Sequence, residues 1–376
     1  MEFKNTPKSN RAGGIKMKRI AVIGSGVAGL VSSYYLSKEH HVDLYEAGDR
    51  IGGHTHTVPV QEENKIVPVD TGFIVFTKEN YPNFMALLTE LDVPIANSDM
   101  SFSMYCQATP YYWGSDAPMG LFAQRKNIFK PKHYAFLRGI QKFSEQALED
   151  FKSGLTGDLS LGEYLDLRKT PHAVVVNYVL PMTSAIWSAS FEESLQFPAN
   201  SFIRFWKHHQ LLDLGHGWQW KTIFEGSQNY IDAILPKISG EIHVNSPVIG
   251  VESETDRVHV VTETSNDWYD GVVIAAHADQ ALRMRSNPSE LESNLLGKWS
   301  YSSNETFLHT DPRFMPPSKN AWCSWNVLKP TSKSFNHPVS VTYWMNRLQP
   351  LDTDQDYFVT LNPNEEIPKE HIIKKM

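Results

Sequence analysis

The stretch Ile20–Gly29, IAVIGSGVAG, decides how the first part of this chain folds. A short apolar run leads directly into Gly24-Ser25-Gly26-Val27-Ala28-Gly29, and the helix-like segment LVSSYYLSKEH follows. In G-x-G-x-x-G after a strand, the first glycine permits a tight turn, the second lets the backbone approach a pyrophosphate, and the third lets helix and strand pack closely. Phosphates then meet free N–H groups at a helix N-terminus. The stretch predicts a strand–turn–helix unit that binds a dinucleotide through these six residues.

An acidic residue follows at the distance expected for a ribose contact. A helix to about Glu39 and a strand HVDLYEA complete a βαβ opening, and Glu46 lies 22 residues after Gly24. A carboxylate there can accept hydrogen bonds from both ribose hydroxyls, and it would repel a 2′-phosphate. The site is therefore expected to use Glu46 and its neighbour Ala47 and to exclude NADP.

A second glycine pair comes soon after this carboxylate, in RIGGHTHT from Arg50 to Thr57. Two adjacent glycines give a loop whose backbone can pass close to a bound cofactor. Farther on, KIVPVDTGFIVF predicts a strand interrupted at Asp70-Thr71-Gly72. That interruption is either a strand bulge or a second cofactor contact.

Size and composition narrow the class of protein. The chain has 376 residues, 41% hydrophobic and 20% charged, which predicts a globular protein of about two domains. A net charge of -7 argues against a nucleic-acid partner. Two distant cysteines without C-x-x-C indicate neither zinc nor a disulfide framework, and a cytoplasmic setting is expected. No apolar run is long enough for a transmembrane helix, and residues 1–16 are expected to be a disordered leader before Met17.

The order of the motifs resembles the N-terminal flavin domain of the flavin-containing amine oxidase and phytoene-desaturase superfamily. Its second motif, R-x-G-G-R-x-x-T, is matched by Arg50, Gly52, Gly53 and Thr57, whereas His54 stands at the second arginine. The stretches PVDTGFIVF, NYPNF, NSDMSFS, PMTSAIWSAS and FPANSFIRF are similar to bacterial NAD/FAD-binding proteins associated with cyclopropane-fatty-acid synthase-like enzymes.

This resemblance implies FAD as the cofactor and adds four expected contacts to those of the glycine motifs. His54 would line or flank the flavin site, the segment around Val248 would return to the adenine side, and Thr71 and Gly72 would lie beside the flavin. The family's last glycine-containing segment has no counterpart after Leu351, which favours a truncated chain that retains FAD weakly. Metal binding is not expected, because His54 and His56 are too few ligands.

The expected fold class is α/β, a Rossmann-like FAD-binding domain with an inserted helical and antiparallel-sheet substrate domain. Residues 17–79 and 216–290 are expected to form the FAD-binding domain, and residues 80–215 and 291–376 the substrate domain. Helices are expected to dominate residues 80–215, as in NYPNFMALLTELD and HYAFLRGIQKFSEQALEDF. The later region from YSSNETFLHT to FVTLNP is rich in aromatic and β-branched residues, which predicts antiparallel strands. In the substrate domain, SFIRFWKHHQLLDL is either a basic, aromatic helix that rests on a lipid surface or gates an apolar tunnel, or a core helix. Phe202, Phe205 and Trp206 at i, i+3, i+4 spacing fit both alternatives.

These features predict an FAD-dependent oxidoreductase that accepts hydride from a hydrophobic, fatty-acyl or amine substrate. The alternatives are a non-catalytic FAD- or NAD-binding accessory protein of a lipid-modifying enzyme, or a truncated inactive member. No lysine can be placed beside the flavin, so the catalytic residues stay unassigned. The oligomeric state is likewise open, and peripheral membrane contact is compatible with the sequence.

Overall fold

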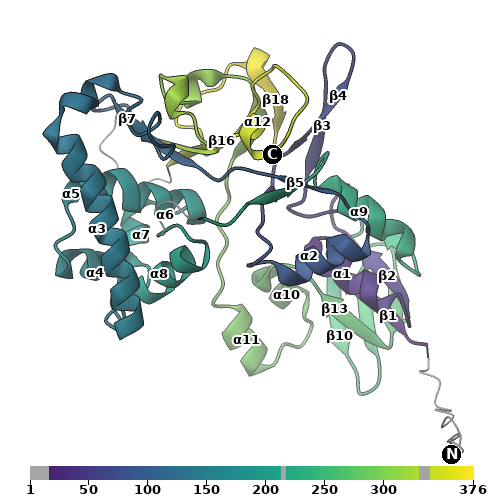
Figure 1. Ribbon diagram of the computed structural model, residues 1–376. Helices are drawn as coiled ribbons and strands as arrows, with labels where there is room; N and C mark the ends of the chain where they lie inside the picture. The colour runs from purple at the N-terminus through teal and green to yellow at the C-terminus, as the bar shows by residue number, and fades with distance from the viewer. Residues whose placement is uncertain (1–16, 213–216, 330–338) are drawn as a thin grey trace, which may run out of the picture. The chain divides into compact units, whose positions relative to one another are not determined.

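The computed structural model describes residues 17–212, 217–329 and 339–376 (Figure 1). Unit 1 consists of Met1–Thr55 and Tyr230–Tyr301, and unit 2 of His56–Asn229 and Ser302–Met376. The expected leader, residues 1–16, lies outside the described residues. These bounds differ from the expected ones, most clearly because residues 56–79 belong to unit 2.

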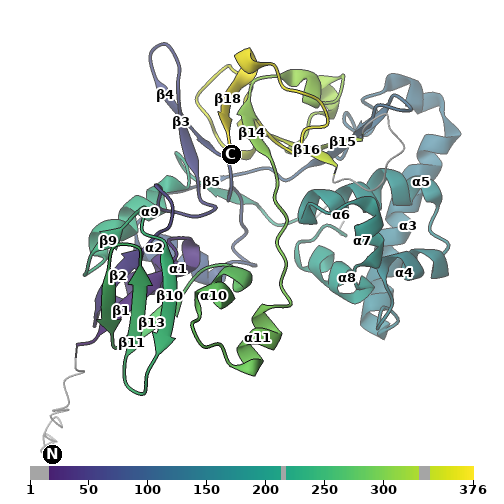
Figure 2. The same cartoon turned by 180° about the vertical axis from the view of Figure 1, so that it is seen from behind.

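Unit 1 is built on a parallel sheet with strand order β13-β1-β2-β9 (Figures 1 and 2). Strand β1 pairs with β2 from Arg19↔His41 to Ile23↔Tyr45, and with β13 on its other side. Ala21, Val22 and Leu44 are fully buried, as an apolar strand covered on both faces requires. The carboxyl ends of β1, β2 and β13 therefore meet at one edge, where the glycine turn begins.

A second, antiparallel sheet of β10, β11 and β12 completes unit 1 and packs its apolar side chains with those of β1 and β2. The elements of unit 1 are β1 (Arg19–Ile23), α1 (Val27–Leu36), β2 (His41–Tyr45), η3 (Leu235–Lys237), β9 (Ile242–His243), β10 (Val248–Ser253), β11 (Val258–Thr262), β12 (Asn266–Tyr269), β13 (Gly271–Ile274), α10 (Ala278–Met284) and α11 (Glu290–Leu296), while helix α9 (Gln228–Ile234) carries the chain from unit 2 into unit 1.

Unit 2 has a seven-stranded sheet with the order β18-β14-β17-β16-β15-β6-β7. The late aromatic region forms antiparallel strands as the sequence predicts, but β15 also pairs in parallel with β6, from Trp325↔Phe102 to Lys329↔Cys106. The strands of unit 2 are β3 (Thr57–Gln61), β4 (Ile66–Asp70), β5 (Ile95–Asn97), β6 (Phe102–Cys106), β7 (Tyr111–Gly114), β8 (Lys221–Ile223), β14 (Thr306–His309), β15 (Trp325–Lys329), β16 (Ser340–Trp344), β17 (Phe358–Leu361) and β18 (Ile372–Lys375). Strands β5, β6 and β7 lie in the segment that was expected to be helical.

The helices of unit 2 enclose its largest apolar core. In α3 the side chains of Phe136, Ile140, Phe143 and Ala147 are buried, and their spacing of four, three and four residues places them on one face. Phe202, Ile203 and Trp206 of α8 enter the same core, which favours the core-helix alternative for that segment. The helices are α2 (Pro82–Glu90), η1 (Arg125–Phe129), α3 (Pro131–Ser153), α4 (Leu161–Leu167), α5 (His172–Val174), η2 (Val175–Val179), α6 (Leu180–Trp187), α7 (Phe191–Gln196), α8 (Ala199–His208), η4 (Pro312–Phe314), η5 (Lys319–Ala321), α12 (Met345–Leu348) and η6 (Lys369–His371).

The hairpin β3–β4 explains why unit 2 begins earlier than the sequence suggests. Val58 and Val60 alternate with outward-facing residues, as do Val67 and Val69 on the partner strand. These four valines form a core with residues near the end of the chain, among them Leu308. Because that burial is long-range, no local pattern assigns the hairpin to unit 2.

Candidate functional site

The turn after β1 requires glycine at its first and last positions. Gly24 has a φ of +97°, and a Cβ atom there would lie 2.4 Å from the carbonyl oxygen of Ala275. A Cβ atom on Gly29 would lie 1.8 Å from the carbonyl oxygen of Gly24. Helix α1 can therefore approach the strand ends only because both positions lack a side chain.

The middle glycine of the motif faces open space instead. No heavy atom lies within 4 Å of the place where a Cβ of Gly26 would be, and Gly26 is the N-cap residue of α1. The ten-residue helix has no side-chain cap and no acidic residue in its first turn, where Val27 and Ala28 are exposed. Its first N–H groups are thus available to a phosphate, at the positive end of the helix dipole.

Glu46 is tied to this turn through Ser25. Its carboxylate accepts hydrogen bonds from the backbone N–H of Ser25 at 3.0 Å, from Ser25 Oγ, and from the N–H of Gly48 at 2.8 Å. Ser25 is fully buried, and its Oγ also accepts from the N–H of Gly52 at 3.2 Å. Ser25 therefore joins the glycine turn after β1, the carboxylate of Glu46 and the second glycine loop within one hydrogen-bond network.

Arg50 holds the second glycine loop in shape. Its Nη1 donates to the carbonyl oxygen of Thr55 at 2.6 Å, and its Nη2 donates to that of Gly53 at 2.5 Å. Partial burial lowers the pKa of this guanidinium. A Cβ atom on Gly53 would lie 2.8 Å from Cα of Gly26, so the loop passes directly against the phosphate turn. Arg50 positions the loop, and its contact with a cofactor stays a prediction.

A stack of three rings lies next to this loop, at the end of β13. The ring of His54 stacks on that of His277 with a centroid distance of 6.0 Å, and His277 stacks on Tyr301 at 4.0 Å. His277 was not singled out from the sequence, because its proximity to His54 depends on strand order. The only local signal was its place three residues after the apolar strand GVVI.

The expected adenine-side segment lies beside Glu46. The N–H of Ser246 donates to the carbonyl oxygen of Glu46 at 2.9 Å, and the N–H of Asn245 to that of Gly48 at 2.8 Å. Val248 starts β10 two residues later and is half-buried. The backbone thus brings this segment next to Glu46, Ala47 and Gly48, while a contact of Val248 with the cofactor stays a prediction.

Three of the expected cofactor contacts, Thr57, Thr71 and Gly72, lie in unit 2 around the buried carboxylate of Asp70. Thr57 Oγ1 donates to Asp70 at 2.5 Å, and Ser227 donates to it from its N–H and its Oγ at 3.0 and 2.8 Å. Gln349 Nε2 adds a bond of 3.1 Å. These hydrogen bonds favour the charged carboxylate and lower its pKa, but burial has the larger effect and raises the pKa of Asp70 to about 6. Asp70 therefore binds Thr57, which follows the passage of the chain from unit 1 into unit 2, and Ser227, which precedes its return to unit 1.

Thr71 and Gly72 follow Asp70 in the chain. The N–H of Thr71 donates to the carbonyl oxygen of His56 at 2.8 Å, and its Oγ1 to the same oxygen at 3.0 Å. The segment is an end of strand β4 held to the start of β3, and a flavin-adjacent role for Thr71 and Gly72 stays a prediction.

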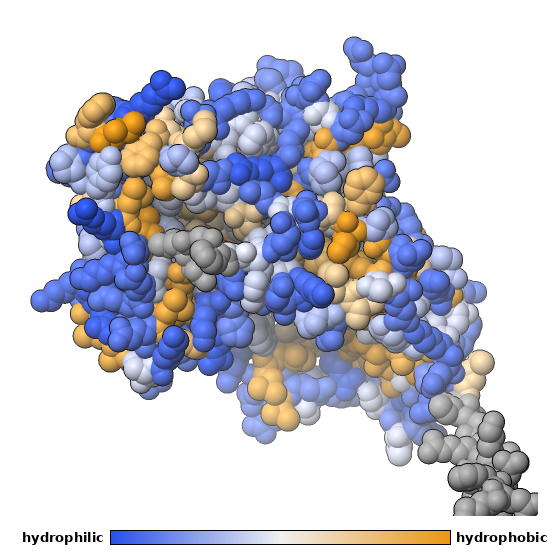
Figure 3. Space-filling model, in the orientation of Figure 1, coloured by the Kyte–Doolittle hydropathy of each residue, from blue (hydrophilic) through white to orange (hydrophobic). Residues whose placement is uncertain are grey.

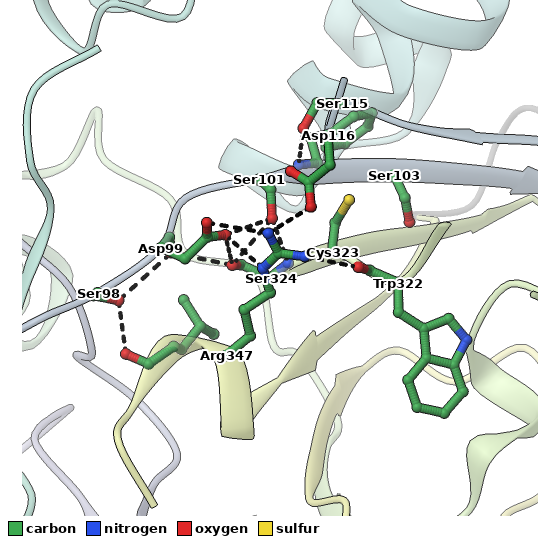
Figure 4. Close-up of polar contacts among 12 residues, drawn as sticks. Ser98, Asp99, Ser101, Ser103, Ser115, Asp116, Trp322, Cys323, Ser324 and Arg347 are labelled. Carbon is green, nitrogen blue, oxygen red and sulfur yellow. Dashed lines mark hydrogen bonds and ion pairs between the residues drawn. The ribbon is translucent and has the colours of Figure 1, made fainter. Parts of the chain in front are cut away.

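A charged cluster that the sequence did not reveal lies at one end of the unit 2 sheet (Figure 4). Arg347 donates from Nε and Nη2 to Asp99 at 2.9 and 3.2 Å, and its Nη2 lies 2.5 Å from Oδ2 of Asp116. Ser101 and Ser324 also donate to Asp99, at 2.6 and 2.7 Å. These hydrogen bonds and the guanidinium outweigh partial burial and lower the pKa of Asp99. Two carboxylates and one guanidinium leave a residual negative charge here.

Metal sites and membrane-spanning helices are both absent from the described residues. In residues 17–212, 217–329 and 339–376, no three His, Cys, Asp or Glu side chains are arranged to hold a metal ion. None of the helices in these ranges is both long enough and apolar enough to cross a membrane.

Known proteins resemble this chain in sequence and in fold. The sequence profile of flavin-containing amine oxidoreductases matches residues 27–356. The flavin-dependent L-tryptophan oxidase RebO of Lentzea aerocolonigenes is 41% identical over 56 residues, which is 15% of this chain and 12% of that protein. The match thus spans only a small part of that relative.

Two solved structures show the shared fold. The CLA-producing fatty acid isomerase from P. acnes has a TM-score of 0.64 at 14% identity, with 96% of this chain and 85% of that chain covered. Cyclohexylamine oxidase from Brevibacterium oxydans IH-35A has a TM-score of 0.61 at 15% identity, covering 92% and 75%.

The residues of unit 1 fit an FAD cofactor. The open side of Gly26 and the uncapped start of α1 suit its diphosphate, and the carboxylate of Glu46 suits a ribose. The family profile extends over most of the chain. The chain therefore belongs to the flavin-containing amine oxidoreductase family.

Proposed function

We propose that this enzyme acts in the cytoplasm and oxidises a hydrophobic small molecule, with a fatty-acyl compound as the first candidate. The observation that carries the proposal is a set of half-buried aromatic side chains in unit 2. Phe73 and Phe84 pack edge to face with centroids 5.4 Å apart, and Trp325 and Tyr343 do so at 5.0 Å. Such pairs offer apolar surface of defined shape for a hydrocarbon chain.

Bound FAD supplies a hydride acceptor at N5 of its ring. In unit 1, Gly26, Val27 and Glu46 would hold the diphosphate and ribose, and Ser25 with Arg50 would keep the two glycine loops in place. In unit 2, the aromatic side chains would orient an apolar substrate and exclude water from it. The reaction itself asks for little acid–base chemistry from the protein.

A hydrophobic amine is the second candidate, because of the residual negative charge near Arg347. Asp99 and Asp116 carry one more charge than Arg347 neutralises, and both carboxylates are partly exposed. An ammonium group would be attracted to that charge, whereas a carboxylate would be repelled. The fatty-acyl candidate would then have to enter with its carboxyl group esterified or directed elsewhere.

Anaerobic reduction of the flavin distinguishes the two candidates. The FAD-loaded enzyme is mixed with long-chain acyl esters or with hydrophobic primary amines, and loss of the 450 nm flavin band is followed. The proposal expects one class to bleach the flavin and the other not to. If neither class reduces it, a hydrophobic substrate is wrong.

A variant separates recognition of the amine from the chemistry. Asp116→Asn removes the residual charge near Arg347 while keeping the size of the side chain. For an amine substrate it should raise KM with little change in kcat, and for an acyl substrate both should stay as they are. The acyl composition of membranes from a deletion strain gives an independent check, since identical profiles across growth conditions would contradict the acyl candidate.

A further inference from the structure

The segment between Asp116 and Glu145 has a charge opposite to that of the whole chain. It contains no acidic residue and six cations, whereas the chain has a net charge of -7. The six are Arg125, Lys126, Lys130, Lys132, Arg138 and Lys142. Arg125, Lys126, Lys130 and Lys132 are all exposed, within eight residues of each other. Among the described residues, none of these four forms an ion pair, and their charges are open to solvent.

Large apolar side chains are exposed in the same segment. Phe129 at the end of η1 has 86% of its surface exposed, and its chain neighbour Ile128 has 45%. Met119 has 63% of its surface exposed. A side chain such as Phe129 would gain about 1.5–3 kcal/mol from complete burial, so leaving it in water is costly. Figure 3 shows apolar (orange) atoms interrupted by hydrophilic (blue) ones over the part of unit 2 that carries β7.

The backbone that carries these side chains is held in place by contacts within the segment itself. Tyr134 donates from its hydroxyl to the carbonyl oxygen of Ile128 at 3.0 Å, and its ring packs against Phe122 at 5.7 Å. The N–H of Phe122 donates to the carbonyl oxygen of Pro118 at 3.2 Å, which brings Met119 to the same part of the surface. The exposed groups thus form one ordered surface, here called the 119–134 surface.

We infer that the 119–134 surface docks this enzyme on an anionic lipid bilayer. The four exposed cations would lie among the headgroup phosphates, and Phe129, Ile128 and Met119 would enter the boundary between headgroups and acyl chains. Helix α3 starts at Pro131 without a side-chain cap, so the positive end of its dipole faces the same side. Neither a lone charge run nor a lone apolar patch would select a bilayer, but the two together match its layered chemistry.

The alternative lipid-facing segment that the sequence suggested is α8. Its Phe202, Ile203 and Trp206 are buried in the core of unit 2, which leaves its polar edge and part of Phe205 outside. The 119–134 surface instead leaves Phe129 exposed among cations. The lipid-facing segment is therefore expected at residues 119–134 and not at α8.

Binding of the FAD-loaded full-length enzyme to sedimented vesicles tests the inference. The vesicles contain either phosphatidylcholine alone or phosphatidylcholine with 30% phosphatidylglycerol, in 0.1 M salt. The enzyme should bind the anionic vesicles and not the neutral ones. Binding should be lost in 1 M salt, where the Debye length falls to about 3 Å.

Two variants separate the charged from the apolar contribution. The triple variant Lys126→Gln, Lys130→Gln and Lys132→Gln should bind about 100-fold more weakly, at about fivefold for each cation removed. Phe129→Ser should bind about tenfold more weakly, because a partly inserted aromatic side chain is lost. Far-UV circular dichroism confirms that the variants fold.

Matched controls are available elsewhere on the chain. Lys78→Gln, Lys237→Gln and Lys298→Gln remove the same charge from other exposed positions, and Phe224→Ser removes another exposed aromatic side chain. Both control variants should bind like the unchanged enzyme. Equal binding by the 119–134 variants and their controls would overturn the inference. So would vesicle binding that DNA or an acidic polypeptide displaces while Phe129→Ser has no effect, because the surface would then be a polyanion site.

Discussion

Replacing the buried carboxylate of Asp70 by an amide should remove a specific part of the pH dependence of stability. Asp70 is fully buried in unit 2, and the groups around it, Thr57, Ser227 and Gln349, are hydrogen-bond donors without positive charge. Burial raises its pKa from an ordinary value of 3.8 to about 6. Asp70→Asn keeps the shape of the side chain and abolishes its titration.

The size of the effect follows from this shift. A difference of about two pKa units between the folded and unfolded chain corresponds to about 3 kcal/mol. Well below pH 4 the carboxyl is protonated in both the folded and the unfolded chain, so no stability is lost. Between about pH 4 and pH 6 the unfolded chain ionises first, and the stability of the folded chain falls as the pH rises. Above about pH 6 the loss stays at its full value.

Urea unfolding of the FAD-loaded enzyme and its Asp70→Asn variant measures this difference. Tryptophan fluorescence reports mainly on unit 2, because only Trp268 and Trp299 of the ten tryptophans belong to unit 1. The free energy of unfolding of the unchanged enzyme, minus that of the variant, should fall by about 2.5 kcal/mol between pH 4 and pH 7.5, because part of the full loss has already occurred at pH 4. Any constant cost of the amide cancels from this comparison.

A matched control is Asp158→Asn, which changes an exposed carboxylate of the same unit. Its difference from the unchanged enzyme should stay within about 0.5 kcal/mol over the whole pH range. If the stability difference between the unchanged enzyme and Asp70→Asn is equally independent of pH, burial does not raise the pKa of Asp70. If that difference instead grows with pH, the pKa is lowered and the hydrogen bonds outweigh burial.

Three further predictions concern the cofactor site and the charged cluster. Gly29→Ala places a Cβ atom 1.8 Å from the Gly24 carbonyl oxygen, so it should lower the free energy of unfolding by about 2 kcal/mol or more and also weaken FAD binding. Gly26→Ala has no heavy atom within 4 Å of its new Cβ atom, so it should weaken FAD binding without changing the melting temperature. Equal melting temperatures for the two variants would contradict this prediction. Glu46→Gln removes a charge that accepts three hydrogen bonds and should weaken FAD binding about tenfold in fluorescence titration, and unchanged affinity would mean that the carboxylate serves only the turn. Arg347→Met should lower the free energy of unfolding in urea by about 2 kcal/mol and raise the pKa of Asp99, which NMR can follow. An unchanged pKa would show that the hydrogen bonds from Ser101 and Ser324 alone stabilise the charge of Asp99.

Local sequence was sufficient for the cofactor turn and for its place in a βαβ unit. Each step from Ile20 to Gly29 depends on neighbours in the chain: an apolar strand, a glycine with positive φ, and a helix that begins without a side-chain cap. Glu46 was found for the same reason, because the length of α1 and β2 places it at the end of the adjacent strand. The family resemblance then identified FAD, which the spacing alone left open.

The positioning network around that turn was only partly visible. Ser25 belongs to the glycine motif, but its buried Oγ joins Glu46 to Gly52, and no spacing rule indicates this. Likewise His277 stacks on His54 because β13 lies beside β1 in the sheet. Strand order brings these residues together, and strand order was not encoded in any local pattern.

The sequence alone determined the glycine turn after β1, the acidic residue that follows β2, and the helical character of α2, α3 and α8. The tertiary structure alone decided that hairpin β3–β4 belongs to unit 2, that Asp70 meets Gln349 across 279 residues of chain, and that Arg347 meets Asp99 across 248. The reason is physical: turns and helices are stabilised by neighbours a few residues away, whereas buried charges and sheet edges are stabilised by whichever distant segment the folded core brings against them.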